Sequence, residues 1–226
     1  MSENRRMLFR VVLLTATIAV LFTTATLSAD MKALRKRAEA GDTRAQFDIG
    51  SMYEQGLGVR QDYAEAARWY RRAGERGDVR AQYNLGIMFQ NGWGVPQNDA
   101  RAVQWYRKAA LQGMAPAQYN LGHMYHNGLG VPQDYSEAAR WYRRAAEQGD
   151  VDAQRILGVA YYMGEHVPRD LVQSYFWFSL AASRLSGGEY RQAAEARARI
   201  EKELTPEQLE RAQSMVRDWE KSHPRR

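Results

Sequence analysis

The chain repeats itself every 36 residues, and this period restricts its possible folds more than any other feature of the sequence. An Ala-Gln pair and an aromatic pair each occur four times at that spacing. The Ala-Gln pairs are Ala45-Gln46, Ala81-Gln82, Ala117-Gln118 and Ala153-Gln154. The aromatic pairs are Trp69-Tyr70, Trp105-Tyr106, Trp141-Tyr142 and Trp177-Phe178. A fixed period of roughly 20–50 residues is typical of a solenoid, in which each unit buries its apolar face only against its neighbours.

Each unit has the pattern of two helices joined by a turn. In residues 78–113, Asp78 precedes a segment in which apolar or small residues recur every three or four positions, as on one face of a helix. An aspartate there can accept hydrogen bonds from the unpaired amides of the first turn. Gly92 ends the segment, because glycine enters the left-handed conformation at no steric cost. Asn98 then precedes a second helix, which carries the aromatic pair Trp105-Tyr106.

This unit resembles the Sel-1-like repeat, a relative of the tetratricopeptide repeat. The matching features are Ala-Gln-x-x-Leu-Gly, the Gly-x-Gly-Val turn, an acidic helix cap, and Trp-Tyr followed by paired small residues. They extend from Asp42 to about Ser186, and the fourth copy departs from the pattern, with His166 in place of the second turn glycine. The resemblance implies an all-α fold, a right-handed α-α superhelix of about four repeats with helical caps. It also implies bacterial export, because similar C-terminal helices close many exported proteins of this kind.

The repeat boundaries give a plan for the whole chain. The last helix should begin after Thr205, with a proline at its first position and Gln208 completing a capping box. The predicted segments are a leader at 1–29, an N-terminal capping helix at 30–41, repeats at 42–77, 78–113, 114–149 and 150–186, and C-terminal capping helices with a tail at 187–226.

Residues 1–29 have the layout of a secretory signal peptide. Three arginines within the first ten residues precede an uncharged stretch from Val11 to Ala29, which ends in small residues. The rival interpretation is an uncleaved membrane anchor at residues 11–29, because this stretch approaches the length that spans a bilayer. The pair Arg5-Arg6 leaves twin-arginine export open as well. The sequence therefore predicts a periplasmic or secreted protein, or one that is anchored in the inner membrane and faces the periplasm.

Composition excludes several classes of function. The chain has no cysteine, so disulfides, thiol catalysis, cysteine-ligated zinc and a lipoprotein anchor are excluded. Removing the three arginines and one glutamate of residues 1–29 from the chain's 32 basic and 26 acidic residues leaves a net charge of +4. So mild a charge does not fit a nucleic-acid-binding protein.

Catalytic and metal-binding patterns are weak. His123 and His126 lie three residues apart on one helix face and could supply two metal ligands, but a third ligand is missing. No serine begins a Ser-x-x-Lys run or lies within Gly-x-Ser-x-Gly. Some cysteine-rich secreted members of the resembling family have been connected with β-lactams, which leaves an envelope hydrolase or β-lactam-binding protein as an alternative. The main prediction is a protein that is not an enzyme and needs no cofactor or metal.

Comparison between the repeats separates folding from recognition. A position that is identical in every copy serves a need common to all copies, which is folding, whereas a position that varies can serve a partner. In solenoids of the tetratricopeptide type the first helices line a groove, and the sequence predicts that this groove binds an unidentified protein partner. A membrane-anchored structural organiser is the other alternative. The predicted groove residues are Arg44, Phe47, Arg80, Tyr83, Ile87, Asn91, Tyr119, His123, His126, Asn127, Arg155 and Tyr162.

Arginines gather on the second helices of two repeats. Their spacing of three and four residues places them on one outward face, with a glutamate nearby for local pairing. The simple interpretation is a solvated surface, and the sharper one is contact with an acidic component of the envelope. The two sets are Arg68, Arg71, Arg72 and Arg76 in the first repeat, and Arg140, Arg143 and Arg144 in the third.

Export is the first testable prediction. The basic start, apolar centre and small-residue end of the leader predict a mature chain that begins near Asp30. N-terminal sequencing and intact mass of the protein from the periplasmic fraction measure this directly. Recovery of the full-length chain from the cytoplasm would contradict the prediction, and a full-length chain in the inner membrane would support the anchor.

Overall fold

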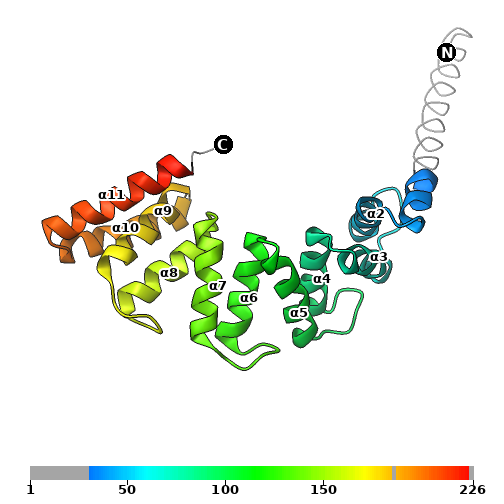
Figure 1. Ribbon diagram of the computed structural model, residues 1–226, viewed down its shortest axis with the longest axis horizontal. Helices are drawn as coiled ribbons and strands as arrows, with labels where there is room; N and C mark the ends of the chain where they lie inside the picture. Colours follow the sequence, from blue (N-terminus) through cyan, green and yellow to red (C-terminus); the bar gives the residue numbers. More distant parts are fainter. Residues whose placement is uncertain (1–30, 185–186, 224–226) are drawn as a thin grey trace, which may run out of the picture. The chain divides into compact units, whose positions relative to one another are not determined.

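The computed structural model describes residues 31–184 and 187–223, so the predicted leader at 1–29 lies outside it. All regular secondary structure in this part of the chain is helical (Figure 1). Residues 31–39 form the first described helix. The first helices of the repeats are α2 (Thr43–Gln55), α4 (Val79–Asn91), α6 (Ala115–Asn127) and α8 (Val151–Met163). The second helices are α3 (Tyr63–Glu75), α5 (Asp99–Leu111), α7 (Tyr135–Glu147) and α9 (Leu171–Arg184), followed by α10 (Gly187–Glu203) and α11 (Pro206–Ser222).

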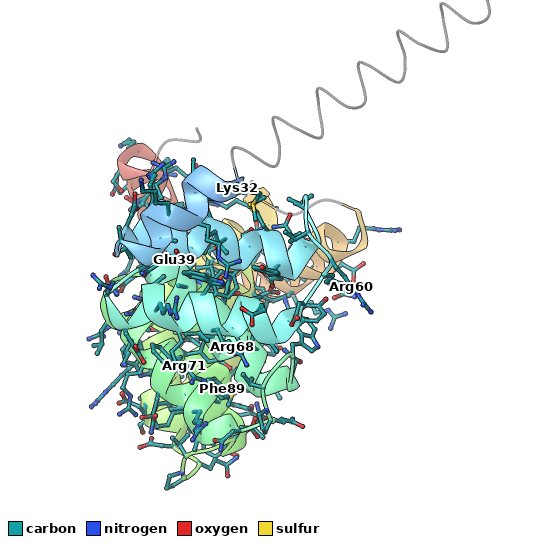
Figure 2. The ribbon with its side chains drawn as sticks, turned by 90° about the vertical axis from the view of Figure 1, so that its right-hand side faces the viewer. Lys32, Glu39, Arg60, Arg68, Arg71 and Phe89 are labelled. Atoms are coloured by element: carbon teal, nitrogen blue, oxygen red, sulfur yellow. The ribbon has the colours of Figure 1, made fainter. Side chains whose placement is uncertain are left out.

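The helices fall into two compact units. The N-terminal unit holds α2, α3 and α4 as far as Met88, together with Gly92–Pro96, and its charged side chains such as Lys32, Arg60 and Arg68 are exposed (Figure 2). The C-terminal unit holds Phe89–Asn91 and everything from Gln97 onward. Within it each helix from α5 to α9 packs against the next, and α10 and α11 pack against α9. This all-α solenoid of four repeats is the predicted fold class.

The helix ends lie where their capping residues predict. Asp78 accepts a hydrogen bond from the Ala81 amide at 2.9 Å, and Gly92 ends α4 with a left-handed φ of 72°. The predicted capping box at the start of α11 is present, with the Gln208 amide donating to the Thr205 hydroxyl at 3.2 Å. Helix α6 lacks a side-chain cap, since Met114 stands at that position and a proline follows in the first turn. No helix in the described part of the chain is both long and apolar enough to cross a bilayer.

The glutamine of each Ala-Gln pair joins a repeat to the helix before it. Its side chain is at most 4 % exposed in all four copies. In each copy the amide group donates to a backbone carbonyl eight residues earlier, at 2.9–3.1 Å. That carbonyl belongs to the last turn of the preceding helix, where carbonyls have no partner within the helix. The donor–acceptor pairs are Gln46–Ala38, Gln82–Gly74, Gln118–Ala110 and Gln154–Ala146.

Glycines inside the first helices let the aromatic rings of the second helices lie against the helix backbone. A Cβ atom added at Gly50 would stand 2.6 Å from a ring carbon of Tyr70, and one added at Gly158 would stand 2.8 Å from a ring carbon of Phe178. Optimal separations between carbon atoms are about 3.5–4 Å, so no side chain fits. Tyr70 is fully buried in this arrangement, and each ring fills the core between the two helices of its own repeat.

The glutamine bond gives a test by substitution at Gln154, which is fully buried and donates to the Ala146 carbonyl at 3.0 Å. Gln154→Met keeps the volume and loses the bond, so we expect the free energy of unfolding to fall by about 1 kcal/mol. Gln154→Glu places an unpaired carboxylate against a carbonyl oxygen, so we expect a loss of about 3 kcal/mol or more at neutral pH. Urea denaturation followed by circular dichroism measures both.

The glutamate variant should also respond to pH. Burial raises the pKa of the new carboxyl above its unfolded value, so its cost is absent below the unfolded pKa and grows as the pH rises. The difference between Gln154→Glu and Gln154→Met should therefore shrink in acid. Equal losses for the two variants at neutral pH would contradict the assigned role of the buried amide.

The glycine contact gives a second test. Alanine normally stabilises a helix by about 1 kcal/mol relative to glycine. At Gly50 the clash with the Tyr70 ring should outweigh that gain, and we expect Gly50→Ala to lower the free energy of unfolding by about 1–2 kcal/mol. Gly188→Ala in α10 is the control, because an added Cβ there meets no atom within 4 Å, and it should not destabilise the protein. A gain in stability at Gly50 would show that the ring is free to move.

Candidate protein-interaction site

In the N-terminal unit two of the predicted groove residues meet. The Arg80 guanidinium lies over the Phe47 ring, with its carbon 3.9 Å from the ring centroid, and also pairs with Asp78 at 3.1 Å. The Phe47 ring in turn lies against Tyr70, with ring centroids 5.4 Å apart. Arg80 is therefore an exposed cation in a fixed position. Arg44 is also exposed, and within the described part of the chain it has no comparable ring contact or ion pair.

The Phe47 side chain packs against the core of its repeat as well as facing solvent in part. Two repeats later in the chain, Tyr119 lies against Tyr142 with ring centroids 5.7 Å apart, as Phe47 lies against Tyr70. Burial raises the pKa of the Tyr119 hydroxyl, and the carboxylates of Asp152 and Asp150 add to this. Tyr119 is half-buried, so it presents only part of its ring to a partner. Among the other predicted residues, Tyr83 and Ile87 are also half-buried and Asn91 is exposed.

The last turn of the first helix carries a side chain that makes the same contact in the first two repeats and a different one in the fourth. Glu54 accepts a hydrogen bond from the Tyr70 hydroxyl at 2.5 Å, and Gln90 accepts one from the Tyr106 hydroxyl at 2.7 Å. The residue at the same position in the fourth repeat, Tyr162, donates to Glu203 of α10 at 2.9 Å. Tyr162 is a predicted groove residue, and its hydroxyl contacts the C-terminal helix α10.

The histidines of α6 have different environments. His123 is half-buried, and burial lowers the pKa of its imidazole, with the nearby His126 adding to the effect. His123 is therefore neutral at neutral pH. The Asn127 side chain donates to the His123 backbone carbonyl at 2.9 Å, while His126 is exposed. Over residues 31–184 and 187–223 no group of three or more His, Asp or Glu side chains is placed to hold a metal ion.

A hollow of about 270 Å³ lies between α6, α7 and α8 in the C-terminal unit, and we call it the α6–α8 hollow. It brings together His126 and Arg155, both predicted groove residues, with an apolar surface from α8. On that helix Val159 is 42 % exposed and Met163, one turn further on, is 59 % exposed. The residues that line the hollow include His126, Tyr135, Tyr142, Arg155, Val159, Glu165 and His166.

We attribute this hollow to His166. In the second and third repeats the same turn position is glycine, and a Cβ at Gly94 or Gly130 would stand 2.1 or 2.3 Å from a backbone carbon of the preceding repeat. His166 has a positive φ of 60°, the one such value for a non-glycine residue in the described part of the chain. A Cβ atom does not fit the close approach that these glycines make, and the His166 ring stacks on Tyr135 with centroids 3.6 Å apart.

The departure at His166 is visible in the sequence, but its consequence is not. His126 also contacts Tyr135, edge-on with centroids 5.1 Å apart, so Tyr135 lies between two histidine rings. Neither Tyr135 nor Glu165 was among the predicted site residues. The signal was the combination of a side chain at a glycine position with an aromatic residue at the start of the preceding second helix.

Comparisons with known proteins place this architecture among solved structures. A protective antigen with an SLR fold, present in uropathogenic Escherichia coli strains, is 46% identical over 69% of this chain, with a TM-score of 0.66. This chain spans only 33% of the length of that protein. A Sel1 repeat protein from Oxalobacter formigenes is 34% identical, with a TM-score of 0.66, over 77% of this chain and 74% of that one. The comparison with curated proteins finds no match.

The repeats themselves match a family model. The model described as the Sel1 repeat matches residues 43–78, 79–114, 115–150 and 151–184. These four matches follow one another without a gap, and they cover most of the chain. Proteins built from this repeat are generally scaffolds for interactions between proteins. The chain belongs to the Sel1 repeat family.

Proposed function

We propose that this chain is a non-enzymatic scaffold of the bacterial cell envelope that binds a partner protein through the first helices of its repeats. The α6–α8 hollow is the anchor point of that contact. The observation that carries the proposal is the lining of the hollow, in which His126, Arg155 and Val159 stand at positions that differ between repeats. Such positions are not needed for the packing that all repeats share.

The chemistry of the hollow fits a bulky apolar side chain of the partner. Val159 and Met163 leave an exposed apolar stripe on α8, and the rings of Tyr135 and Tyr142 line the hollow beside it. Arg155 also lines the hollow, and its guanidinium pairs with the exposed Asp152 at 3.4 Å. Interfaces concentrate their binding energy in a few apolar or aromatic anchors that are surrounded by polar groups. A partner segment with one apolar anchor next to a polar or acidic residue matches this arrangement.

The location in the envelope rests on separate support. The leader-like residues 1–29 favour export. The related Escherichia coli protein is a protective antigen, a property that agrees with a location outside the cytoplasm. Because this chain spans a third of that protein, the role of the whole antigen is not carried over.

Site-specific photo-crosslinking tests the contact surface. A photoreactive phenylalanine analogue at Met163, beside the α6–α8 hollow, should form adducts with a defined partner in intact envelopes, which mass spectrometry then identifies. The matched control is the same analogue at Leu111, near the end of α5, where the side chain is 67 % exposed but lies outside the hollow. We expect adducts at Met163 and none at Leu111. Equal adduct formation at both positions would contradict the assignment.

A substitution in the hollow then tests the anchor. Val159→Asp places a charge where the proposal puts an apolar contact, so we expect the adduct yield at Met163 to fall by about tenfold. The melting temperature should stay nearly unchanged, because Val159 is already 42 % exposed. Leu111→Asp is the matched control and should leave the yield intact. An unchanged yield with Val159→Asp would overturn the hollow as the anchor.

A further inference from the structure

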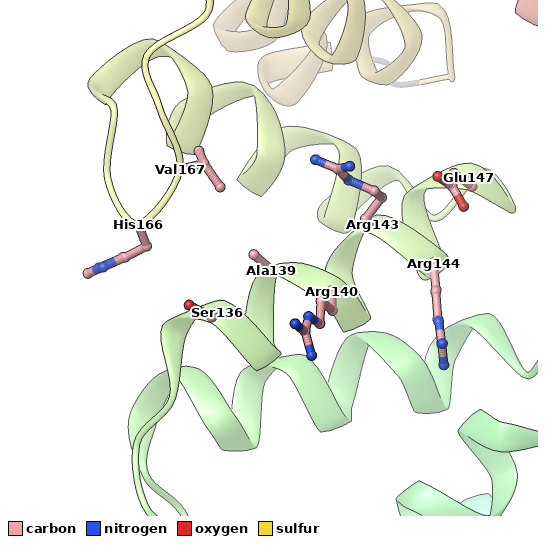
Figure 3. A pocket seen from close by; sticks show the side chains of 8 residues that line it. All are labelled: Ser136, Ala139, Arg140, Arg143, Arg144, Glu147, His166 and Val167. Carbon is pink, nitrogen blue, oxygen red and sulfur yellow. The ribbon is translucent and has the colours of Figure 1, made fainter.

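A second hollow lies on the other side of His166, against the outer face of α7, and we call it the α7 hollow. Its volume is about 470 Å³. Three arginines of α7, Arg140, Arg143 and Arg144, line it, and the Val167 side chain turns toward it from the loop above Ala139 (Figure 3). His166 and Ala139 line both hollows, so the two hollows meet at the loop that carries the histidine.

Two of these arginines are held by partners that do not neutralise them. Arg143 donates a hydrogen bond to the Tyr161 hydroxyl, and the Arg144 guanidinium lies over the Trp141 ring, 4.7 Å from its centroid. A phenol and an indole fix the direction of a guanidinium and leave its charge in place. Arg140 pairs with Glu137 at 3.3 Å, and its side chain is 78% exposed.

The charge of the α7 hollow is therefore positive. Glu147 also lines it, but one carboxylate there faces three guanidinium groups. Even with Glu137 counted, the positive groups outnumber the negative ones. The positions of the cations are also set before any ligand arrives, which reduces the entropy that binding must overcome.

The directions of the arginines select the kind of anion. Arg143 points toward α8, whereas Arg140 and Arg144 point to the opposite side of the helix in the same view (Figure 3). Guanidinium groups that diverge in this way cannot all close on a single phosphate. They can each take one of several carboxylates that are spaced along an extended chain, because arginine pairs with a carboxylate through two parallel hydrogen bonds.

We propose that the α7 hollow binds an acidic peptide segment of a partner protein, with Arg140, Arg143 and Arg144 contacting successive carboxylates. Ala139 and Val167 supply the apolar surface on which the stems of glutamate or aspartate side chains lie. This surface adjoins the α6–α8 hollow and shares Ala139 and His166 with it, but none of the three arginines lines that hollow. The two proposals can therefore fail independently.

The chain contains its own control for this site. Helix α3 carries Arg68, Arg71 and Arg72 in the same sequence pattern, and these side chains are also exposed. In that case the facing turn residue is Gly94, which lies close against the start of α3, with room for no Cβ atom. The arginines of α3 and α7 carry the same charge, but the residue in the facing turn differs. Comparing the two sets therefore distinguishes a site with a defined shape from general attraction between charges.

The experiment measures binding of the full chain to a dye-labelled peptide, Gly-Asp-Glu-Ala-Glu-Asp-Gly, by fluorescence anisotropy. Changing Arg140, Arg143 and Arg144 to glutamine should weaken binding by about tenfold, since three exposed ion pairs each contribute little. The same change at Arg68, Arg71 and Arg72 should leave the affinity within about twofold. The neutral peptide Gly-Asn-Gln-Ala-Gln-Asn-Gly should not bind. Circular dichroism establishes that each variant is folded.

His166→Gly tests the shape of the site without changing an arginine. Glycine restores the turn residue of the other repeats, so the loop can close on α7 and the variant should fold, with peptide binding weakened as by the α7 arginine changes. Equal loss from the α3 and α7 arginine sets would overturn the proposal, and so would full binding by His166→Gly. Displacement of the peptide by equimolar inorganic phosphate would assign the site to phosphate instead. Arginine-dependent binding to phosphatidylglycerol vesicles without peptide binding would assign it to a membrane.

Discussion

The buried glutamine bond is the interaction on which the rest of the structure depends. Each glutamine donates to the last turn of the preceding helix, so it fixes both the distance and the rotation between consecutive helices. An amide is suited to this place because it is neutral and can be buried when its donor is paired. Since every copy has the same bond, the residues at a given repeat position can be compared between copies. Departures from the pattern at such positions therefore have local consequences that can be compared.

His166 is one such departure. A histidine with positive φ is strained relative to glycine, and strain of this kind is of order 1–3 kcal/mol. The stack on Tyr135 offsets part of that cost. The surrounding structure tolerates the remaining strain, and the two hollows lie beside the loop that carries His166. A scaffold whose regular positions are all used for packing acquires binding surfaces where one repeat stops following the others.

The sequence predicted the features that arise from neighbouring residues. The caps at Asp78 and Thr205 and the turn at Gly92 are local, because each depends on residues within one turn of the helix end. The contact of Tyr162 with Glu203 could not be predicted, since the two are 41 residues apart and the repeat pattern ends between them. The α6–α8 hollow was missed for a related reason. It depends on how closely a loop approaches a helix, and a single Cβ atom decides that distance.

One molecule can bind both an acidic peptide and an apolar anchor, because one face of α7 packs against the neighbouring helix and the opposite face is exposed to solvent. Its buried side packs Tyr142 against Gly122 of α6, which fixes the helix, and its outer side presents the arginines. Arg143 connects the two regions, since its partner Tyr161 belongs to α8, the helix that also carries Val159. A partner that draws Arg143 away from Tyr161 would leave the hydroxyl of this buried side chain without its donor. Such a loss costs free energy, so the ligand best suited to the α7 hollow is one that adds a carboxylate to Arg143 while the bond to Tyr161 remains.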